Sequence, residues 1–297
     1  MNVRYKQSLA SKIFDIVNII IMILILVIML YPFLNQLAIS LNDSTDAIRG
    51  GIYLWPRKFS LDSYKFVLAD DSLVKSVIMS ILRVIVGTIT SVVATALLAY
   101  VITIKHFSGR KFMRRLFVIT MYFSGGLIPF YLLMVNLGLN ESFAIYWVPS
   151  LFGAYNMLLI AAYMQEIPDA LRESARIDGA NEVQIFFKIM IPMCIPVLAA
   201  VCIFVGVSHW NSWFDVMIYN PSGKFDTLQV YLRRILLETE ALSKITDQQQ
   251  AATEYSKLTV TTVRAATTMI VTIPIALIYP FFQKYFVSGI TIGAVKE

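Results

Sequence analysis

Charge is scarce in this sequence. Only 15% of its 297 residues are Asp, Glu, Lys or Arg, whereas about 25% is usual for a soluble domain. Hydrophobic residues make up 58%, and the mean hydropathy is +0.69. So much apolar surface excludes a disordered chain and argues against a soluble enzyme. The composition is that of an integral membrane protein.

Cysteine and histidine are also rare, with two of each. Cys194 and Cys202 lie in one apolar run, so no disulfide framework follows. The sequence has no HExxH motif and no evident pair of nucleophile and base. It also lacks a GxxxxGK[ST] loop to hold nucleotide phosphates. We therefore expect no catalytic residue, cofactor or metal in this chain, and we do not expect the chain itself to hydrolyse ATP.

Six long stretches are interpreted as free of Asp, Glu, Lys and Arg, and each can hold one membrane helix, which needs roughly 20 residues. The first has an apolar core that is too long for a signal peptide, so we expect it to be a membrane helix. The sequence predicts an all-α integral membrane protein with six transmembrane helices, at 16–42, 84–104, 116–140, 142–165, 189–221 and 265–283.

Short loops predict the orientation of these helices. The loop 105–115 contains five Lys or Arg residues, whereas the turn 137–141 contains none. Because positive residues collect in short cytoplasmic loops, we expect both termini in the cytoplasm. The formal charge of +6 is then explained by the basic loop residues that orient the helices in the membrane. We therefore expect no nucleic-acid partner.

This topology divides the chain into four parts. We expect a cytoplasmic segment (1–15), a first helix with an outer loop (16–72), a core of five helices (73–283) and a cytoplasmic tail (284–297). A second long outer segment, 215–258, includes an amphipathic stretch at 227–242. Four of its apolar residues share one helical face, namely Leu228, Leu232, Ile235 and Leu236.

The stretch 167–191, between the fourth and fifth predicted helices, has the pattern of two short helices. Pro168 and Asp169 suit a helix start, and Asp178-Gly179 is a turn signal. The apolar faces are predicted to be Leu171, Ser174 and Ala175 in the first helix, and Val183, Phe186, Phe187 and Met190 in the second. The opposite face, with Arg176, Asp178, Glu182 and Gln184, is left for a cytoplasmic partner. From the residues alone, the pair is either an interfacial connector or a docking surface.

The residues from Glu173 to Pro192 resemble the EAA signature of permeases of importer-type ATP-binding-cassette (ABC) transporters. Residues on the family pattern are Glu173, Ala175, Gly179, Ile189 and Pro192, while Ser174 and Ile191 depart from it. The segments 167–172, 209–215 and 289–296 are similar to maltose-type sugar permeases, particularly the second permease of oligosaccharide importers. The resemblance covers roughly residue 61 to the end, where Glu297 replaces the family's usual Gly.

The resemblance implies a type I ABC importer permease in a bacterial cytoplasmic (inner) membrane. The loop 167–191 would be a coupling helix docked on an ATPase that carries ATP and Mg. The coupling residues would be Glu173, Ser174, Ala175, Asp178, Gly179, Ala180, Ile189 and Pro192. Implied partners are a second, non-identical permease, two ATPase subunits and an extracellular or periplasmic solute-binding protein. The implied substrate is an oligosaccharide, with uronate-containing polysaccharide fragments as one option.

Helix breaks and aromatic residues suggest where a substrate would pass. Gly125-Gly126 with Pro129, and Pro149 with Gly153, interrupt the third and fourth predicted helices. Such breaks require protein or a water-filled cavity around them. Aromatic rings stack on sugars and amides pair with hydroxyls, so the candidates are Tyr122, Asn156, His209, Trp210, Asn211 and Trp213. For the tryptophans, an aromatic belt at the membrane interface is the preferred alternative.

Two further patterns each allow two interpretations. Arg83 and Arg264 precede predicted helices, so we expect them to reach the interface by snorkelling, with contact to an anion as the alternative. Small residues recur every fourth position in the second helix, as Gly87, Ser91, Thr95 and Ala99. This ridge indicates close helix packing, with a pathway role for its hydroxyl groups as the alternative.

Two other functions compete with sugar import. An ABC permease for another solute would share the EAA loop but not the 209–215 stretch. An ion-coupled secondary transporter would need ionisable residues buried in its spans. The six stretches are interpreted as having none, which argues against that class.

Overall fold

The structure, a computed structural model, describes residues 9–246, 261–278 and 280. These residues are mostly helical, and none of them forms a β-strand beyond an isolated bridge between Asn42 and Phe59. The predicted all-α class is confirmed. The described residues fall into two units, one of 9–70, 234–246 and 261–272, the other of 71–233, 273–278 and 280.

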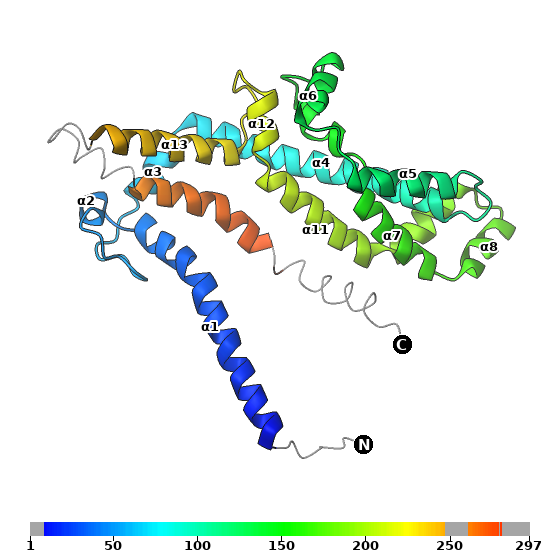
Figure 1. Cartoon of the computed structure of the whole chain (residues 1–297), viewed down its shortest axis with the longest axis horizontal. Helices are drawn as coiled ribbons and strands as arrows, with labels where there is room; N and C mark the ends of the chain where they lie inside the picture. The colour runs from blue at the N-terminus through cyan, green and yellow to red at the C-terminus, as the bar shows by residue number, and fades with distance from the viewer. Residues whose placement is uncertain (1–8, 247–260, 279, 281–297) are drawn as a thin grey trace. The chain divides into compact units, whose positions relative to one another are not determined.

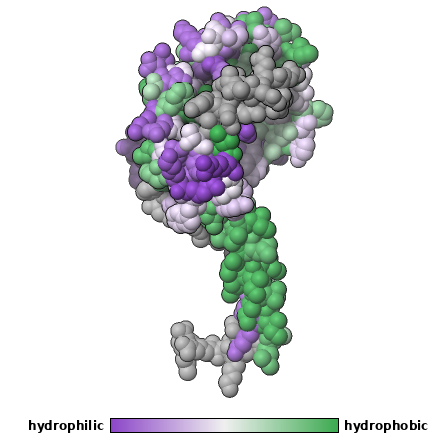
Figure 2. All heavy atoms as spheres, turned by 90° about the vertical axis from the view of Figure 1, so that its left-hand side faces the viewer, coloured by the Kyte–Doolittle hydropathy of each residue, from purple (hydrophilic) through white to green (hydrophobic). Residues whose placement is uncertain are grey.

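The first unit begins with α1 (Leu9–Ser40), which starts earlier than the predicted position 16. Almost all of its large apolar side chains are exposed, and Figure 2 shows a largely hydrophobic column with a few hydrophilic residues near one end. A helix that is apolar all round requires a nonaqueous environment. Its 32 residues are enough to cross a bilayer, so α1 fits the predicted first span.

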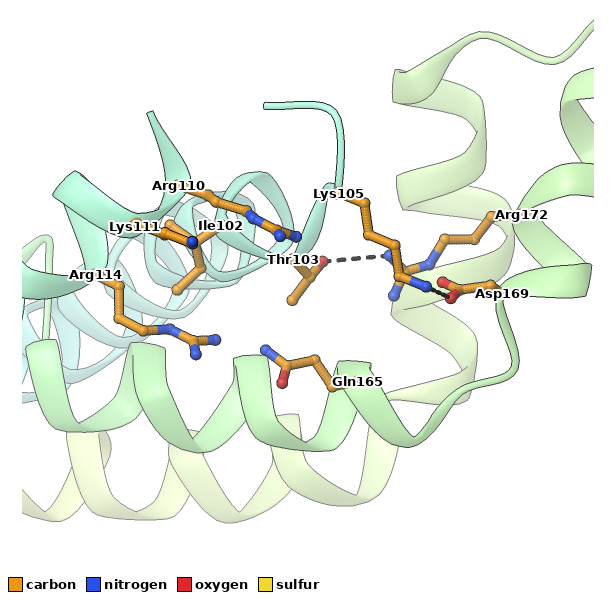
Figure 3. Close-up of a pocket in the computed structure, with 9 residues that line it drawn as sticks. All are labelled: Ile102, Thr103, Lys105, Arg110, Lys111, Arg114, Gln165, Asp169 and Arg172. Atoms are coloured by element: carbon orange, nitrogen blue, oxygen red, sulfur yellow. Dashed lines mark hydrogen bonds and ion pairs between the residues drawn. The ribbon is translucent and has the colours of Figure 1, made fainter. Parts of the chain in front are cut away.

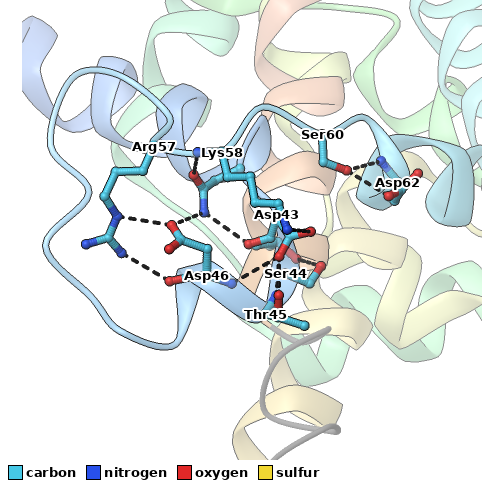
Figure 4. A network of polar contacts seen from close by, with 10 residues as sticks. Asp43, Ser44, Thr45, Asp46, Arg57, Lys58, Ser60 and Asp62 are labelled. Carbon is cyan, nitrogen blue, oxygen red and sulfur yellow. Dashed lines mark hydrogen bonds and ion pairs between the residues drawn. The ribbon is translucent and has the colours of Figure 1, made fainter.

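A polar network orders the loop after α1, which contains α2 (Ser44–Ala47) and leads to α3 (Asp62–Leu68). Asp43 caps α2 by accepting hydrogen bonds from the backbone N–H groups of Thr45 and Asp46, each at 3.1 Å. Arg57 donates to Asp46 at 3.0 Å, and Lys58 lies 3.6 Å from Asp43 (Figure 4). The hydrogen bond from the Thr45 side chain is the main cause of the lowered pKa of Asp43.

The second unit is built around α4 (Asp71–Thr103). Packed beside it are α5 (Arg110–Tyr122), α7 (Ala154–Glu166) and α11 (Ile195–Asn211), as Figure 1 shows. Their apolar side chains form a buried cluster that runs from Val92 to Val205 along the chain. This cluster extends beneath the loop between α7 and α11, so that loop is continuous with the helix core.

The small-residue ridge of α4 lies inside this packing. Ser91 donates to the carbonyl oxygen of Ser150 at 2.9 Å, and Thr95 donates to that of Leu151 at 3.2 Å. A Cβ atom on Gly87 would lie 2.4 Å from Nε2 of His209. All four ridge residues are buried. The predicted packing role is confirmed.

Most of the remaining helices of the described chain are short. They are α6 (Leu127–Asn136), η1 (Phe143–Tyr146), η2 (Val148–Ser150), α8 (Asp169–Ile177), α9 (Glu182–Ile185), the π-helix η3 (Phe186–Met190), α10 (Ile191–Met193), α12 (Phe214–Tyr219), α13 (Leu228–Thr246) and a last helix, Thr261–Ile278. Helix α13 confirms the helix predicted over 227–242, with Leu228 buried on one face.

Three helices of the described residues are long and apolar enough to cross a membrane: α1, α4 and Thr261–Ile278. The number rises to five if two bent pairs each count as one span, with bends of 48° at 143–166 and 82° at 182–211. The third predicted span, 116–140, is split between α5 and α6. Six spans therefore stay a prediction. The predicted tail 284–297, with the motif 289–296, lies outside the described residues.

Candidate functional site

Helices α8 and α9 are the two short helices predicted within 167–191. The backbone conformation of Gly179 ends the first of them. The N–H of Gly179 donates to the carbonyl of Arg176 at 3.0 Å, and that of Ala180 donates to Ala175 at 2.9 Å. This is a Schellman motif, with Gly179 at a φ of +81°. A Cβ there would meet no atom within 4 Å, so backbone conformation rather than crowding favours glycine.

The second helix starts directly after this turn with a capping box. The Asn181 side chain accepts from the Gln184 N–H at 2.9 Å, and the Gln184 side chain accepts from the Asn181 N–H at 3.0 Å. These bonds satisfy backbone donors that the first turn of a helix leaves free. No flexible linker separates α8 from α9, and their relative direction is set by local hydrogen bonds.

Glu182 joins this helix pair to the end of α4. Its carboxylate accepts a hydrogen bond of 2.6 Å from the Tyr100 hydroxyl and one of 2.9 Å from Nε of Arg176. The ring of Phe186 lies 5.3 Å from that of Tyr100, centroid to centroid. One side chain thus links α4, α8 and α9.

Arg172 attaches α8 to the helices on its other side. Its guanidinium donates to the carbonyl of Met164 at 2.9 Å and lies 3.4 Å from the Thr103 hydroxyl. The side chain is 6% exposed. Nearby, Lys105 pairs with Asp169, and this bond is the main cause of the lowered pKa of Asp169. The loop is therefore attached to both α4 and α7.

The predicted apolar faces of the loop are partly wrong. Phe186 and Met190 are buried, but Val183 is 64% exposed and Phe187 is 53% exposed. Residues 186–190 form a π-helix, whose wider turn shifts the register away from α-helical spacing. In α8, Ala175 is buried as predicted, whereas Leu171 and Ser174 are exposed. Arg172 occupies the buried position instead.

The coupling residues implied by the resemblance differ in exposure. Ala175 is buried, Ala180 and Ile189 are half-buried, and the exposed members are Glu173, Ser174, Asp178, Gly179 and Pro192. Arg176 and Glu182, which were predicted to face a partner, are paired with each other. Ile177 is 85% exposed, and the sequence patterns did not single it out; with Val183 and Phe187 it leaves three large apolar side chains of the loop exposed.

The six candidate pathway residues do not form one group. Four belong to the end of α11 and the residues after it: His209, Trp210, Asn211 and Trp213. His209 is buried against Gly87, and the Arg233 guanidinium lies 3.9 Å from the Trp213 ring centroid. Asn156 is half-buried in α7, and Tyr122 ends α5 with 79% of its side chain exposed. Their contact with sugar stays a prediction.

The break between α5 and α6 borders a cavity of about 410 Å³. Its lining includes Ser124, Gly125, Gly126 and Pro129. The residues of the break are exposed and the hollow is open, so the expectation that protein or a water-filled space surrounds the break stays a prediction.

Arg83 overturns a prediction. It is 2% exposed, and both terminal nitrogens bond to the Asp215 carboxylate, one of them at 3.3 Å. Because α4 begins at Asp71, Arg83 lies about three turns inside the helix, so the prediction that it snorkels to the interface is wrong.

Asp215 lies inside the fifth predicted stretch, 189–221. The interpretation that the stretches lack ionisable residues is therefore wrong, and it no longer argues against an ion-coupled transporter.

Comparison with known proteins decides between these classes. Residues 91–214 match the family of binding-protein-dependent transport system inner membrane components. The polygalacturonan/rhamnogalacturonan transport system permease protein YtcP of Bacillus subtilis is 32% identical over 96% of this chain and 99% of its own length. The chain belongs to this family. The permease matches its relative over almost its whole length, including the first helix, whereas the resemblance found in the sequence began near residue 61.

Two solved structures resemble the permease. One chain is from a bacterial ABC transporter involved in the import of the acidic polysaccharide alginate, with a TM-score of 0.85, 28% identity, and coverage of 95% of this chain and 99% of that one. Another chain is from an alginate ABC transporter in complex with an alginate pentasaccharide-bound periplasmic protein. Its TM-score is 0.58 and its identity is 14%, with coverage of 93% of this chain and 96% of that one. At this identity the likeness shows the fold alone. The ABC importer permease fold is confirmed, and the chain is a membrane subunit of such an importer.

Proposed function

We propose that this permease imports oligosaccharides by alternating access, with uronate-containing fragments as the favoured class. It forms one half of the pathway, and a second, non-identical permease forms the other. Two ATPase subunits, which bind ATP and Mg, dock on the loop 167–191. A solute-binding protein delivers the sugar from outside the cell. The loop and both termini lie in the cytoplasm of the bacterial host.

The attachment of the loop to the helix core is the observation that carries this proposal. A loop that transmits force must be connected firmly to the helices it moves and must present a surface to its partner. Glu182 and Arg172 supply the connection, through α4 and α7. Ile177, Val183 and Phe187 supply exposed apolar contact area. The exposed carboxylate of Glu173 is available for a charged hydrogen bond to a basic group of the ATPase.

The proposed sugar class rests on the relatives. The name of the B. subtilis relative specifies polygalacturonan and rhamnogalacturonan, and that of the structural neighbour specifies an acidic polysaccharide. Arg83, for which contact with an anion was the alternative interpretation, is already paired with Asp215, and the guanidinium of Arg233 lies over the Trp213 ring. Their charges therefore add little support for anion binding.

A matched pair of glycine variants tests the role of the loop. Gly179 and Gly138 both have positive φ, +81° and +69°, and a Cβ at either position would meet no atom within 4 Å. Gly179→Asp should abolish ATPase stimulation by the loaded binding protein, whereas Gly138→Asp should retain it. The measurement is ATP hydrolysis by the purified transporter in proteoliposomes. Full stimulation in Gly179→Asp would refute the docking assignment.

A separate measurement tests the sugar class. The cognate solute-binding protein should bind oligogalacturonides more tightly than neutral oligosaccharides of equal length, as measured by titration calorimetry. The same ligands should drive uptake into proteoliposomes that contain the full transporter. Equal or tighter binding of the neutral sugars would reject the uronate class while leaving sugar import intact.

A further inference from the structure

A basic cavity of about 420 Å³ lies where α4, α5, α7 and α8 come together. In Figure 3 the guanidinium groups of Arg110 and Arg114 extend from α5 toward Thr103 and Gln165, and Arg172 reaches in from the opposite side. The volume falls within the range of about 300 to 1,000 Å³ found for small-ligand sites. The cavity is distinct from the exposed apolar surface of the loop.

The charges around this cavity do not balance. Five basic residues line it, namely Lys105, Arg110, Lys111, Arg114 and Arg172, with the single carboxylate of Asp169. That carboxylate is paired with Lys105. In the part of the chain that the structure describes, the other four cations make no ion pair. An anion would reduce the repulsion among them.

Arg172 shows that the imbalance extends into the protein. It is 6% exposed, and its Nε has no hydrogen-bond partner among the described residues. The bonds it makes go to the Met164 carbonyl and to the Thr103 hydroxyl, both uncharged. A buried cation without an anionic partner is costly. Guanidinium groups suit phosphate oxygens because they present several donors in one plane.

We propose that the cavity binds the phosphate group of an anionic phospholipid from the cytoplasmic leaflet. This inference rests on the orientation given under the proposed function, which places the loop-side ends of α4, α5 and α7 at that surface. Phosphate-bearing headgroups bind in basic pockets between membrane helices on the cytoplasmic side. Asp169 and Arg172 belong to α8, so the bound headgroup also touches the coupling loop.

Helix α5 favours a lipid over a free anion. Alongside its basic residues it exposes three large apolar side chains, Phe112, Leu116 and Ile119, at 69%, 47% and 53%. A phospholipid has a phosphate for the cavity and acyl chains for this apolar surface, whereas inorganic phosphate has only the first. The amphipathic pattern of α5 is typical of helices at the membrane interface.

Two neighbouring arginines provide a matched test. Arg114 lines the cavity and Arg115 does not, yet both are exposed on α5 and carry the same charge. The complete transporter is purified with Arg114→Gln or Arg115→Gln, and bound phosphatidylglycerol is counted by native mass spectrometry during detergent exchange. Arg114→Gln should reduce retention about fivefold, since each basic residue at an anionic surface contributes about 1 kcal/mol. Arg115→Gln should reduce it less than twofold.

Competition separates the two sources of phosphate. Excess inorganic phosphate should leave most phosphatidylglycerol bound to the unaltered transporter, and phosphatidylcholine should not replace it. Equal losses in the two variants, no loss in either, or ready displacement by inorganic phosphate would each overturn the lipid site. ATP hydrolysis stimulated by the binding protein is measured on the same samples, so failure of the lipid site is distinguished from failure of the transporter.

Discussion

Two buried arginines, one in the first half of α4 and one of α8 packed against the last turn of α4, are held in opposite ways. Toward the start of α4, Arg83 is 2% exposed and paired with Asp215, with its guanidinium 4.7 Å from the Tyr146 ring centroid. Against its other end packs Arg172, which is 6% exposed and bonded to uncharged groups. The charge of Arg83 is paired with a carboxylate of the chain, and we call this region the closed end. Arg172 leaves positive charge beside a cavity, and we call this region the open end.

This difference separates a structural role from a ligand-binding role. Asp215 follows α11, so its bond to Arg83 ties α4 to a segment 132 residues away and supplies the counter-charge from within the chain. The Arg172 end adjoins the loop that we expect to move with the ATPase. A buried cation whose partner comes from outside can respond to that partner, whereas a cation paired internally cannot.

Removing the carboxylate at the closed end should have the largest effect. Asp215→Asn leaves Arg83 buried without a counter-charge, a change that costs about 3 kcal/mol in such pairs. The midpoint of thermal unfolding of the purified transporter should fall accordingly. Glu238→Gln removes an equal charge from an exposed position of α13 and should leave the midpoint nearly unchanged. Equal midpoints for the two variants would show that Arg83 does not depend on its partner.

Packing beside the closed end gives the next largest effect. Gly87→Ala would place a Cβ 2.4 Å from Nε2 of His209, inside the α4–α11 contact. Overpacking of this kind costs about 2 kcal/mol, which should appear as a lowered unfolding midpoint. At Gly206, on the α11 side, a Cβ would lie 3.4 Å from the Thr88 hydroxyl. A smaller loss for Gly206→Ala is expected, and the reverse order would contradict the observed contact.

At the open end, the hydrogen bond between Tyr100 and Glu182 should have an intermediate effect. Tyr100→Phe removes a donor to a carboxylate, at a cost of about 1 kcal/mol. Because the bond joins the loop to α4, stimulation of ATP hydrolysis by the binding protein should also fall. A double-mutant cycle with Glu182→Gln measures the coupling between the two side chains. Strictly additive losses would show that the bond does not transmit between loop and helix.

The sequence predicted the local features of the open end better than its contacts. Asp178-Gly179 marked the turn because a left-handed conformation there favours glycine, and the EAA resemblance identified the loop. Residues 186–190 form a π-helix, so Phe187 is exposed although α-helical spacing placed it on the buried face. Counting residues at α-helical spacing cannot reveal such a change of register. Arg172 was not singled out, because its burial depends on Met164 and Thr103, which lie on other helices.

The closed end was harder to predict. Arg83 directly precedes an apolar stretch, so an interfacial position was the natural expectation, but α4 extends twelve residues before it, from Asp71. Its partner Asp215 is a single acid inside a long apolar stretch and was passed over in the sequence. Pairing between residues so far apart is a property of tertiary packing. Periodicity and composition do not encode it locally.

The smallest expected effect belongs to the carboxylate at the open end. Lys105 lowers the pKa of Asp169 below its ordinary 3.8, so the pair stabilises the fold above that pH and the contribution is lost as pH falls through the lowered pKa. Both side chains are largely exposed, so Asp169→Asn should cost only about 0.5 kcal/mol at neutral pH and nothing in acid. The measurement compares thermal unfolding midpoints of Asp169→Asn and of the unaltered transporter from neutral pH down to acid pH. Asp178→Asn is the control. A loss as large as that of Asp215→Asn would mean that Asp169 neutralises Arg172, and the cavity would then have no excess charge to offer a lipid.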